Sequence, residues 1–174
     1  MAKAATPQGA KGTKAKAAGA GLPEPGSKAP TFSLPADDGS TVSLKSLAGK
    51  KTVLYFYPKD DTPGCTTEAI AFSALRKKFE AAGTAVLGVS KDTVEKHCKF
   101  RDKHKLTVRL LSDEEGKILE AYGVWAEKSL YGRKFMGINR TTFLIDEKGV
   151  VRKVWPKVKV AGHAEEVLAA AKEI

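Results

Sequence analysis

The chain of 174 residues lacks most features of secreted, membrane or metal-binding proteins. It has two cysteines, too few for a disulfide framework, and no Cys-x-x-Cys pair. Its three histidines do not have the spacing of a zinc site. No signal-peptide core and no apolar stretch of membrane-spanning length occurs. We therefore expect a cytoplasmic, reducing setting, in which a disulfide forms only transiently.

Acidic residues are absent from the first 23 residues, which contain Lys3, Lys11, Lys14 and Lys16. Four of the ten excess positive charges thus lie at this end. Residues 1–21 are mostly Ala, Lys and Gly, and this composition predicts a disordered tail. The tail is either a solubilising leader or a weak contact to nucleic acid or another polyanion. Residues 22–174, which mix both signs of charge, are predicted to form one folded domain.

The apolar pattern of residues 22–174 predicts an α/β fold. Strands are expected at 32–34, 40–43, 53–57, 84–89, 109–111, 141–145 and 150–155. Helices are expected at 65–83, from the N-cap Asp92 to 104, from 112 or 113 toward 122, and at 164–174, with a single turn at 44–47. Residues 123–139 mix aromatic and charged side chains and are interpreted as a long loop with partial helix. The order predicts a parallel βαβ unit and a final hairpin, and hence a mixed sheet with helices on both faces.

Cys65 is the most informative residue of the sequence. The buried strand at 53–57 stops at Pro58, and a polar turn leads to Cys65 on the first turn of the following helix. A thiol reacts as its thiolate, which unpaired N–H groups and the helix dipole stabilise at this position. The alternative is a small buried apolar residue, as many lone cysteines are. The turn residues before Cys65 favour a reactive thiol.

The segment Pro58-Lys-Asp-Asp-Thr62-Pro-Gly-Cys65 resembles the P-x-x-x-T-x-x-C motif of peroxiredoxins. The segment TPGCTTEA is similar to the corresponding segment of the bacterioferritin-comigratory (peroxiredoxin Q) subgroup. The family also has an arginine in a later segment, and in this chain the segment GINRTTFLID contains Arg140. The resemblance runs from about Leu22 to the C-terminus. It implies a thioredoxin-like fold and thiol-dependent reduction of hydrogen peroxide and organic hydroperoxides, without a cofactor or metal.

The resemblance also implies roles for individual residues. Cys65 would attack the peroxide and become a sulfenic acid. Arg140 would stabilise the thiolate and bind the peroxide, although an arginine before a strand is otherwise a surface ion pair. Thr62 would exchange a hydrogen bond with the peroxide or thiolate, and Pro58 would shape the pocket. Glu68 is expected to orient Arg140 rather than transfer a proton, with an exposed carboxylate as the alternative.

Cys98 is the candidate resolving cysteine. One branch of the subgroup has this cysteine five positions after the first, where this chain has Ile70. In a second branch the resolving cysteine lies on the next helix. In this chain that predicted helix contains Cys98, 33 residues after Cys65. An intramolecular disulfide would form after local unwinding, and thioredoxin or a similar thiol reductant would reduce it. The alternative is a one-cysteine peroxidase resolved by an external thiol. The resemblance favours a monomer or a weak dimer.

Two other functions compete with the peroxidase. A thioredoxin-like disulfide oxidoreductase usually needs a Cys-x-x-Cys pair, but Cys65 is followed by Thr66, Thr67 and Glu68. A nucleic-acid-associated or chaperone-like module would use the basic tail and a repurposed fold. The complete set of Pro58, Thr62, Cys65 and Arg140 argues against such a loss of activity. His97, beside Cys98, is expected at the surface, with a role as a base for Cys98 as the alternative. Trp125, Tyr131 and Phe135 are expected to pack at the core or at the rim of the site.

Overall fold

The computed structural model describes residues 21–174. Residues 1–20 of the predicted tail lie outside the described residues, and so does the predicted contact of the tail with a polyanion. The strands are β1 (Ser33–Pro35), β2 (Thr41–Ser43), β3 (Lys51–Phe56), β4 (Thr84–Ser90), β5 (Arg109–Ser112), β6 (Trp125–Leu130), β7 (Arg133–Ile138), β8 (Thr141–Ile145) and β9 (Val151–Trp155). The helices are η2 (Lys45–Leu47, 3-10), α1 (Pro63–Ala74), α2 (Arg76–Ala81), α3 (Val94–His104), α4 (Lys117–Ala121) and α5 (His163–Glu173).

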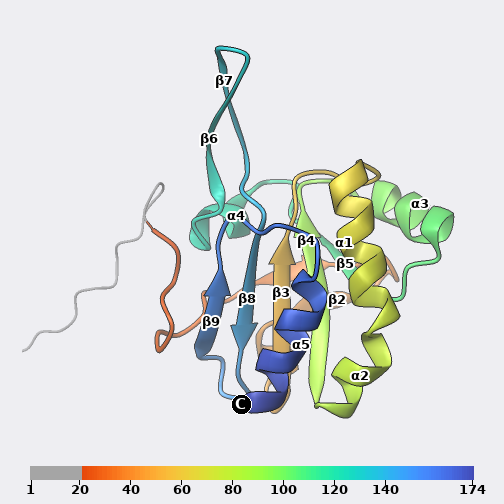
Figure 1. Cartoon of the computed structure of the whole chain (residues 1–174), viewed down its shortest axis with the longest axis vertical. Helices are drawn as coiled ribbons and strands as arrows, with labels where there is room; N and C mark the ends of the chain where they lie inside the picture. The colour runs from red at the N-terminus through yellow and green to blue at the C-terminus, as the bar shows by residue number, and fades with distance from the viewer. Residues whose placement is uncertain (1–20) are drawn as a thin grey trace, which may run out of the picture.

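A five-stranded sheet in the order β5-β4-β3-β8-β9 forms the centre of the domain (Figure 1). β3, β4 and β5 are parallel, whereas β8 is antiparallel to both β3 and β9. The predicted βαβ unit and final hairpin are therefore confirmed. Because β3 is central, all six of its residues are buried.

Side chains of β3 alternate between the two faces of the sheet, as the period of a strand requires. Val53 and Tyr55 point into a cluster that includes side chains of α1, α2, α3 and α5. Leu54 and Phe56 point into a second cluster, which α4 and the β1–β2 pair complete. Helices thus cover both faces of the mixed sheet, as predicted, and none in residues 21–174 has the length and apolarity to span a membrane.

The helix predicted over 65–83 is two helices, which is a correction. At Leu75 (φ −98°, ψ 5°) the backbone N–H bonds back to the Phe72 carbonyl, three residues earlier. The adjacent Ser73 accepts the N–H groups of Thr107 and Val108 at 2.9 and 3.3 Å. These long-range contacts, invisible in local periodicity, lie where α1 ends and α2 begins.

Two helices begin at other residues than predicted. The N-cap of α3 is Thr93, whose hydroxyl oxygen accepts the Lys96 N–H at 3.1 Å. Asp92 instead faces the interior. α4 begins only at Lys117, although Asp113 does accept N–H groups of that helix.

Residues 123–139 are not a long loop but contain a β-hairpin. β6 and β7 pair only with each other and project from the body of the domain (Figure 1). Tyr131 and Gly132 between them have φ of 53° and 79°, the positive values typical of a two-residue hairpin turn. Because most of the hairpin is exposed, it has no alternating apolar pattern that would predict strands. Tyr131 is 93% exposed at the tip, which corrects its expected packing role.

Candidate active site

Cys65 lies on α1, just after the loop that follows the carboxyl end of β3. α1 starts at Pro63, a position where the missing N–H of proline costs no hydrogen bond. Thr62 is the N-cap residue by backbone geometry, but its hydroxyl donates to the Lys59 carbonyl at 2.8 Å. Cys65 lies on the first turn of α1, where the N–H groups and helix dipole favour an anion.

Arg140 lies beside the cysteine. The Cys65 side chain is 1% exposed, and its sulfur is 3.4 Å from Nη2 of Arg140. Arg140 directly precedes β8, the antiparallel neighbour of β3, so the sheet brings these distant residues together. A buried anion is unfavourable without a charged partner, and the Arg140 guanidinium lies where it could pair with an anion at this sulfur.

Glu68 holds the other side of the guanidinium. Its Oε1 accepts from Nη1 of Arg140 at 2.6 Å, and its side chain is 1% exposed. Its second oxygen, Oε2, has no hydrogen-bond partner among the described residues. Burial raises the pKa of Glu68 to about 7, although the charge and hydrogen bond of Arg140 oppose the rise. Cys65, Arg140 and Glu68 therefore form one buried, electrostatically coupled cluster.

Two further residues define the space around Arg140. A Cβ at Gly64 would lie 3.1 Å from Nη2 of Arg140, so glycine leaves room for the guanidinium. Lys128 of β6 is a second cation near the site. Burial and the positive charge of Arg140 lower the pKa of Lys128, while Cys65 raises it. Lys128 was missed in the sequence because it falls in the segment interpreted as a loop.

Pro58 and Thr62 lie on the same loop as expected from the motif, both half-buried. Pro58 follows Tyr57, which is 1% exposed. The Thr62 hydroxyl uses its only proton toward Lys59, so toward the site its oxygen acts as an acceptor.

Cys98 lies on α3 and is half-buried. Its sulfur donates to the Asp37 carbonyl at 3.2 Å, a carbonyl that also accepts from Arg101 at 3.0 Å. Both cysteines are free thiols. The two sulfur atoms have different partners, and a bond between them would break the contact of each thiol with its partner.

His97 is fully buried, which corrects its expected place at the surface. Its Nδ1 is 2.7 Å from Oδ2 of Asp60, and its Nε2 is 2.9 Å from the Leu111 carbonyl. Both ring nitrogens are engaged, so His97 has no atom to spare as a base for Cys98. Nothing in the sequence distinguishes Asp60 from its exposed neighbour Asp61, and this network could not be found from it.

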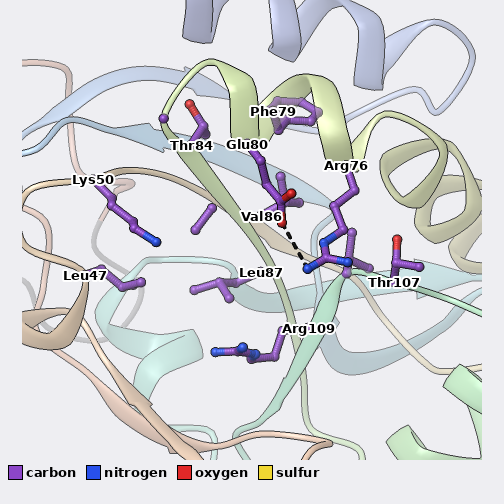
Figure 2. Close-up of a pocket in the computed structure, with 13 residues that line it drawn as sticks. Leu47, Lys50, Arg76, Phe79, Glu80, Thr84, Val86, Leu87, Thr107 and Arg109 are labelled. Atoms are coloured by element: carbon purple, nitrogen blue, oxygen red, sulfur yellow. Dashed lines mark ion pairs between the residues drawn. The ribbon is translucent and has the colours of Figure 1, made fainter.

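A pocket of about 370 Å³ lies at the opposite end of the sheet (Figure 2). It is lined by Lys50, Arg76 and Arg109 around an apolar floor, and Arg76 pairs with Glu80 at 3.0 Å. These residues lie near the amino ends of the parallel strands, whereas Cys65 follows a carboxyl end. Neither cysteine lines the pocket, which is separate from the cysteine site.

Comparison with known proteins gives a consistent result. Residues 25–154 match the model of the AhpC/TSA family. A putative peroxiredoxin bcp of Coxiella burnetii is 54% identical over 145 residues, covering 83% of this chain and 96% of the relative. Peroxiredoxin Bcp of Bacillus subtilis is 49% identical over 151 residues, covering 87% and 96%.

Solved structures give the same picture. Peroxiredoxin Q of Xanthomonas campestris superposes with a TM-score of 0.78 at 46% identity, covering 82% of this chain and 90% of that one. Structures of the bacterioferritin comigratory protein of that organism, with a trapped intermediate and ligand, address its alkyl peroxide reduction activity. They superpose with a TM-score of 0.78 at 45% identity, with the same coverage.

Proposed function

The chain belongs to the AhpC/TSA family as a peroxiredoxin of the bacterioferritin-comigratory (peroxiredoxin Q) group, and from this we propose that Cys65 is its peroxidatic cysteine. The protein is thus an enzyme, a thiol-dependent peroxidase. The observation that carries the assignment is the buried Cys65 sulfur, on the first turn of a helix and 3.4 Å from Arg140.

In the first step the Cys65 thiolate attacks one oxygen of the peroxide. An S–O bond forms, the O–O bond breaks, and the departing oxygen takes a proton to leave as water or an alcohol. Sulfur is oxidised to the sulfenic acid while the peroxide is reduced. Arg140 stabilises the thiolate and the negative charge that develops on the oxygens.

Thr62, Pro58 and Glu68 support this step. The Thr62 oxygen accepts the hydroxyl proton of the peroxide, since its own proton is directed to Lys59. Pro58 limits water at the mouth of the site. Glu68 orients Arg140 through the 2.6 Å contact. We propose organic hydroperoxides beside hydrogen peroxide as substrates, supported by similarity to the Xanthomonas protein studied for alkyl peroxide reduction.

In the second step Cys98 resolves the sulfenic acid. The Cys98 sulfur attacks the Cys65 sulfur, an S–S bond forms and the S–O bond breaks, and the sulfenic hydroxyl leaves as water with the proton of the Cys98 thiol. A dithiol reductant of the thioredoxin type then reduces the disulfide and becomes oxidised itself. Both cysteines belong to one chain, so this cycle needs no second subunit and is compatible with a monomer. We propose the cytoplasm as its setting, where such reductants work.

The test is peroxide-dependent NADPH oxidation with thioredoxin and thioredoxin reductase, comparing wild type, Cys65→Ser and Cys98→Ser. We expect Cys65→Ser to be inactive, and Cys98→Ser to oxidise Cys65 normally but to lose thioredoxin-coupled turnover. Normal turnover of Cys98→Ser would identify a one-cysteine enzyme with an external resolving thiol. Activity in Cys65→Ser would refute the assignment of the nucleophile.

A further inference from the structure

A buried hydrogen-bond network joins the loop before Cys65 to the helix that contains Cys98. The loop residue is Asp60, five positions before Cys65, and the helix residue is His97, directly before Cys98. Their side chains are 6% and 0% exposed, and the Asp60 Oδ2 to His97 Nδ1 distance is 2.7 Å. No peroxide chemistry explains why this pair is buried at the junction of the two cysteine-bearing segments.

The proton positions follow from the partners. The Leu111 carbonyl only accepts, so Nε2 of His97, 2.9 Å away, must donate to it. One proton then lies between Nδ1 of His97 and Asp60. Burial lowers the pKa of His97, but the hydrogen bond and charge of Asp60 outweigh burial, and the net effect is a raised pKa. A proton on His97 is thus stabilised by the hydrogen bond and the charge of Asp60.

Asp60 is also held from two other directions. Its Oδ1 accepts from the Tyr57 hydroxyl at 2.6 Å, and its backbone N–H donates to Asp92 at 2.8 Å. A surface contact reinforces the junction, because Asp61 pairs with Lys103 and His104 of α3 at 2.8 and 2.9 Å. The loop thus has a fixed position on α3 only while that helix is folded.

We propose that His97 and Asp60 are positioning residues that couple the Cys65 loop to α3 and set how fast Cys98 reaches the oxidised Cys65. This inference rests on the proposed role of Cys98. Unwinding α3 around Cys98 pulls His97 from Asp60 and from Leu111, and it leaves a buried charge without its partner. The pair therefore favours the folded conformation and delays the disulfide.

The delay affects the fate of the sulfenic acid. While α3 stays folded, a second peroxide can oxidise Cys65 further to the sulfinic acid, with the peroxide as the oxidant and water or alcohol as the product. Loosening the pair shortens this interval. The His97–Asp60 pair thus controls the partition of oxidised Cys65 between disulfide and sulfinic acid.

The experiment compares wild type, His97→Asn and His163→Asn. Reduced protein is mixed with one equivalent of hydrogen peroxide, quenched with an alkylating reagent, and the Cys65–Cys98 disulfide is quantified over time by mass spectrometry. His163 is a matched control, because it is 4% exposed and bonds to Thr142 at 2.8 Å, joining α5 to β8 instead. A parallel series with excess peroxide measures the sulfinic acid.

We expect His97→Asn to form the disulfide at least about tenfold faster than wild type, because breaking a buried pair removes more than this factor of stabilisation. The sulfinic fraction at a given peroxide excess should fall by a similar factor. If His97→Asn does not fold, Asp60→Asn tests the pair from the other side with the same expectation.

The pH profile separates coupling from loss of stability. Asp60, Tyr57 and Asp92 are the ionisable groups around His97, and burial keeps Tyr57 protonated by raising its pKa. As pH rises through the raised pKa of His97, the imidazolium loses its proton and the pair weakens. The rate ratio of His97→Asn to wild type should therefore be largest at low pH and fall as pH rises.

The outcomes are distinct. Equal disulfide rates in folded His97→Asn and wild type, the same acceleration in His163→Asn, or a pH-independent ratio would overturn the inference and leave the proposed function standing. A wild type that never forms the Cys65–Cys98 disulfide would refute Cys98 as the resolving thiol, and the inference with it.

Discussion

Replacement of Arg140 by lysine tests whether charge alone, or the shape of the guanidinium, activates Cys65. Arg140 uses two nitrogens for two partners: Nη1 to Glu68 at 2.6 Å and Nη2 to the Cys65 sulfur at 3.4 Å. Lysine has one nitrogen at the end of its side chain and cannot reproduce this fork. We expect the ammonium of Arg140→Lys to stay with the Glu68 carboxylate and to leave the sulfur.

The expected magnitude follows from the contact that is lost. A hydrogen bond to a charged group contributes about 1.5–3 kcal/mol. Each 1.36 kcal/mol corresponds to a factor of ten in rate, so the rate constant of Cys65 with peroxide should fall about 10- to 150-fold. Stability should change little, because Glu68 keeps a positively charged partner.

The assay is single-turnover oxidation of Cys65 by stopped flow, with denaturant unfolding measured in parallel. Arg76→Lys is a suitable control, since Arg76 has a 51% exposed side chain and pairs with Glu80 on α2. It should react at the wild-type rate. If folded Arg140→Lys reacts within roughly twofold of wild type, a point charge is sufficient and the argument from the fork geometry is wrong.

Two other changes test the same cluster. The folded-state pKa of Glu68, about 7, is above its ordinary value of 4.5, so ionisation of Glu68 destabilises the fold as pH rises between these values, by up to about 3 kcal/mol. Glu68→Gln should remove this loss of stability. The free energy of unfolding, measured by denaturation at one pH below and one pH above this range, should therefore differ less in Glu68→Gln than in wild type. An equal difference in the two proteins would contradict the burial argument. In Gly64→Ala, the added Cβ 3.1 Å from Arg140 should displace the guanidinium slightly and slow peroxide reduction roughly 3- to 10-fold. The same change should have no effect in an Arg140→Lys background, and an equal effect there would show that Gly64 acts through another residue.

Much of the fold was predictable because its signals are local. The buried run of β3 and the apolar segment of β4 were recognised from composition, and β8 was predicted with its observed bounds, Thr141–Ile145. The break at Leu75 was not predictable, because Thr107 and Val108 bind Ser73 from another part of the chain. The β6–β7 hairpin was missed because exposed strands need no alternation of apolar side chains.

Some residues of the candidate site were likewise predictable from the sequence, and others were not. Cys65 on the first turn of a helix is a local property, so the spacing from the strand to the helix was enough to single it out. The motif and the resemblance supplied Arg140, Thr62 and Pro58 as expectations. The sequence contained no sign that Glu68 would be buried with an unpartnered oxygen, or that Lys128 would lie near the cysteine.

The sequence by itself therefore determined the α/β class and the peroxiredoxin family, and it singled out Cys65 as the predicted reactive thiol, since these depend on short spacings and residue types. Only the tertiary structure decided which charges share the buried space. Asp60 and Asp61 are adjacent in the chain, yet one is buried against His97 and the other pairs with Lys103 at the surface. Burial and pairing depend on which distant elements pack together, and this long-range geometry sets the electrostatics of the site and the coupling between the two cysteine segments.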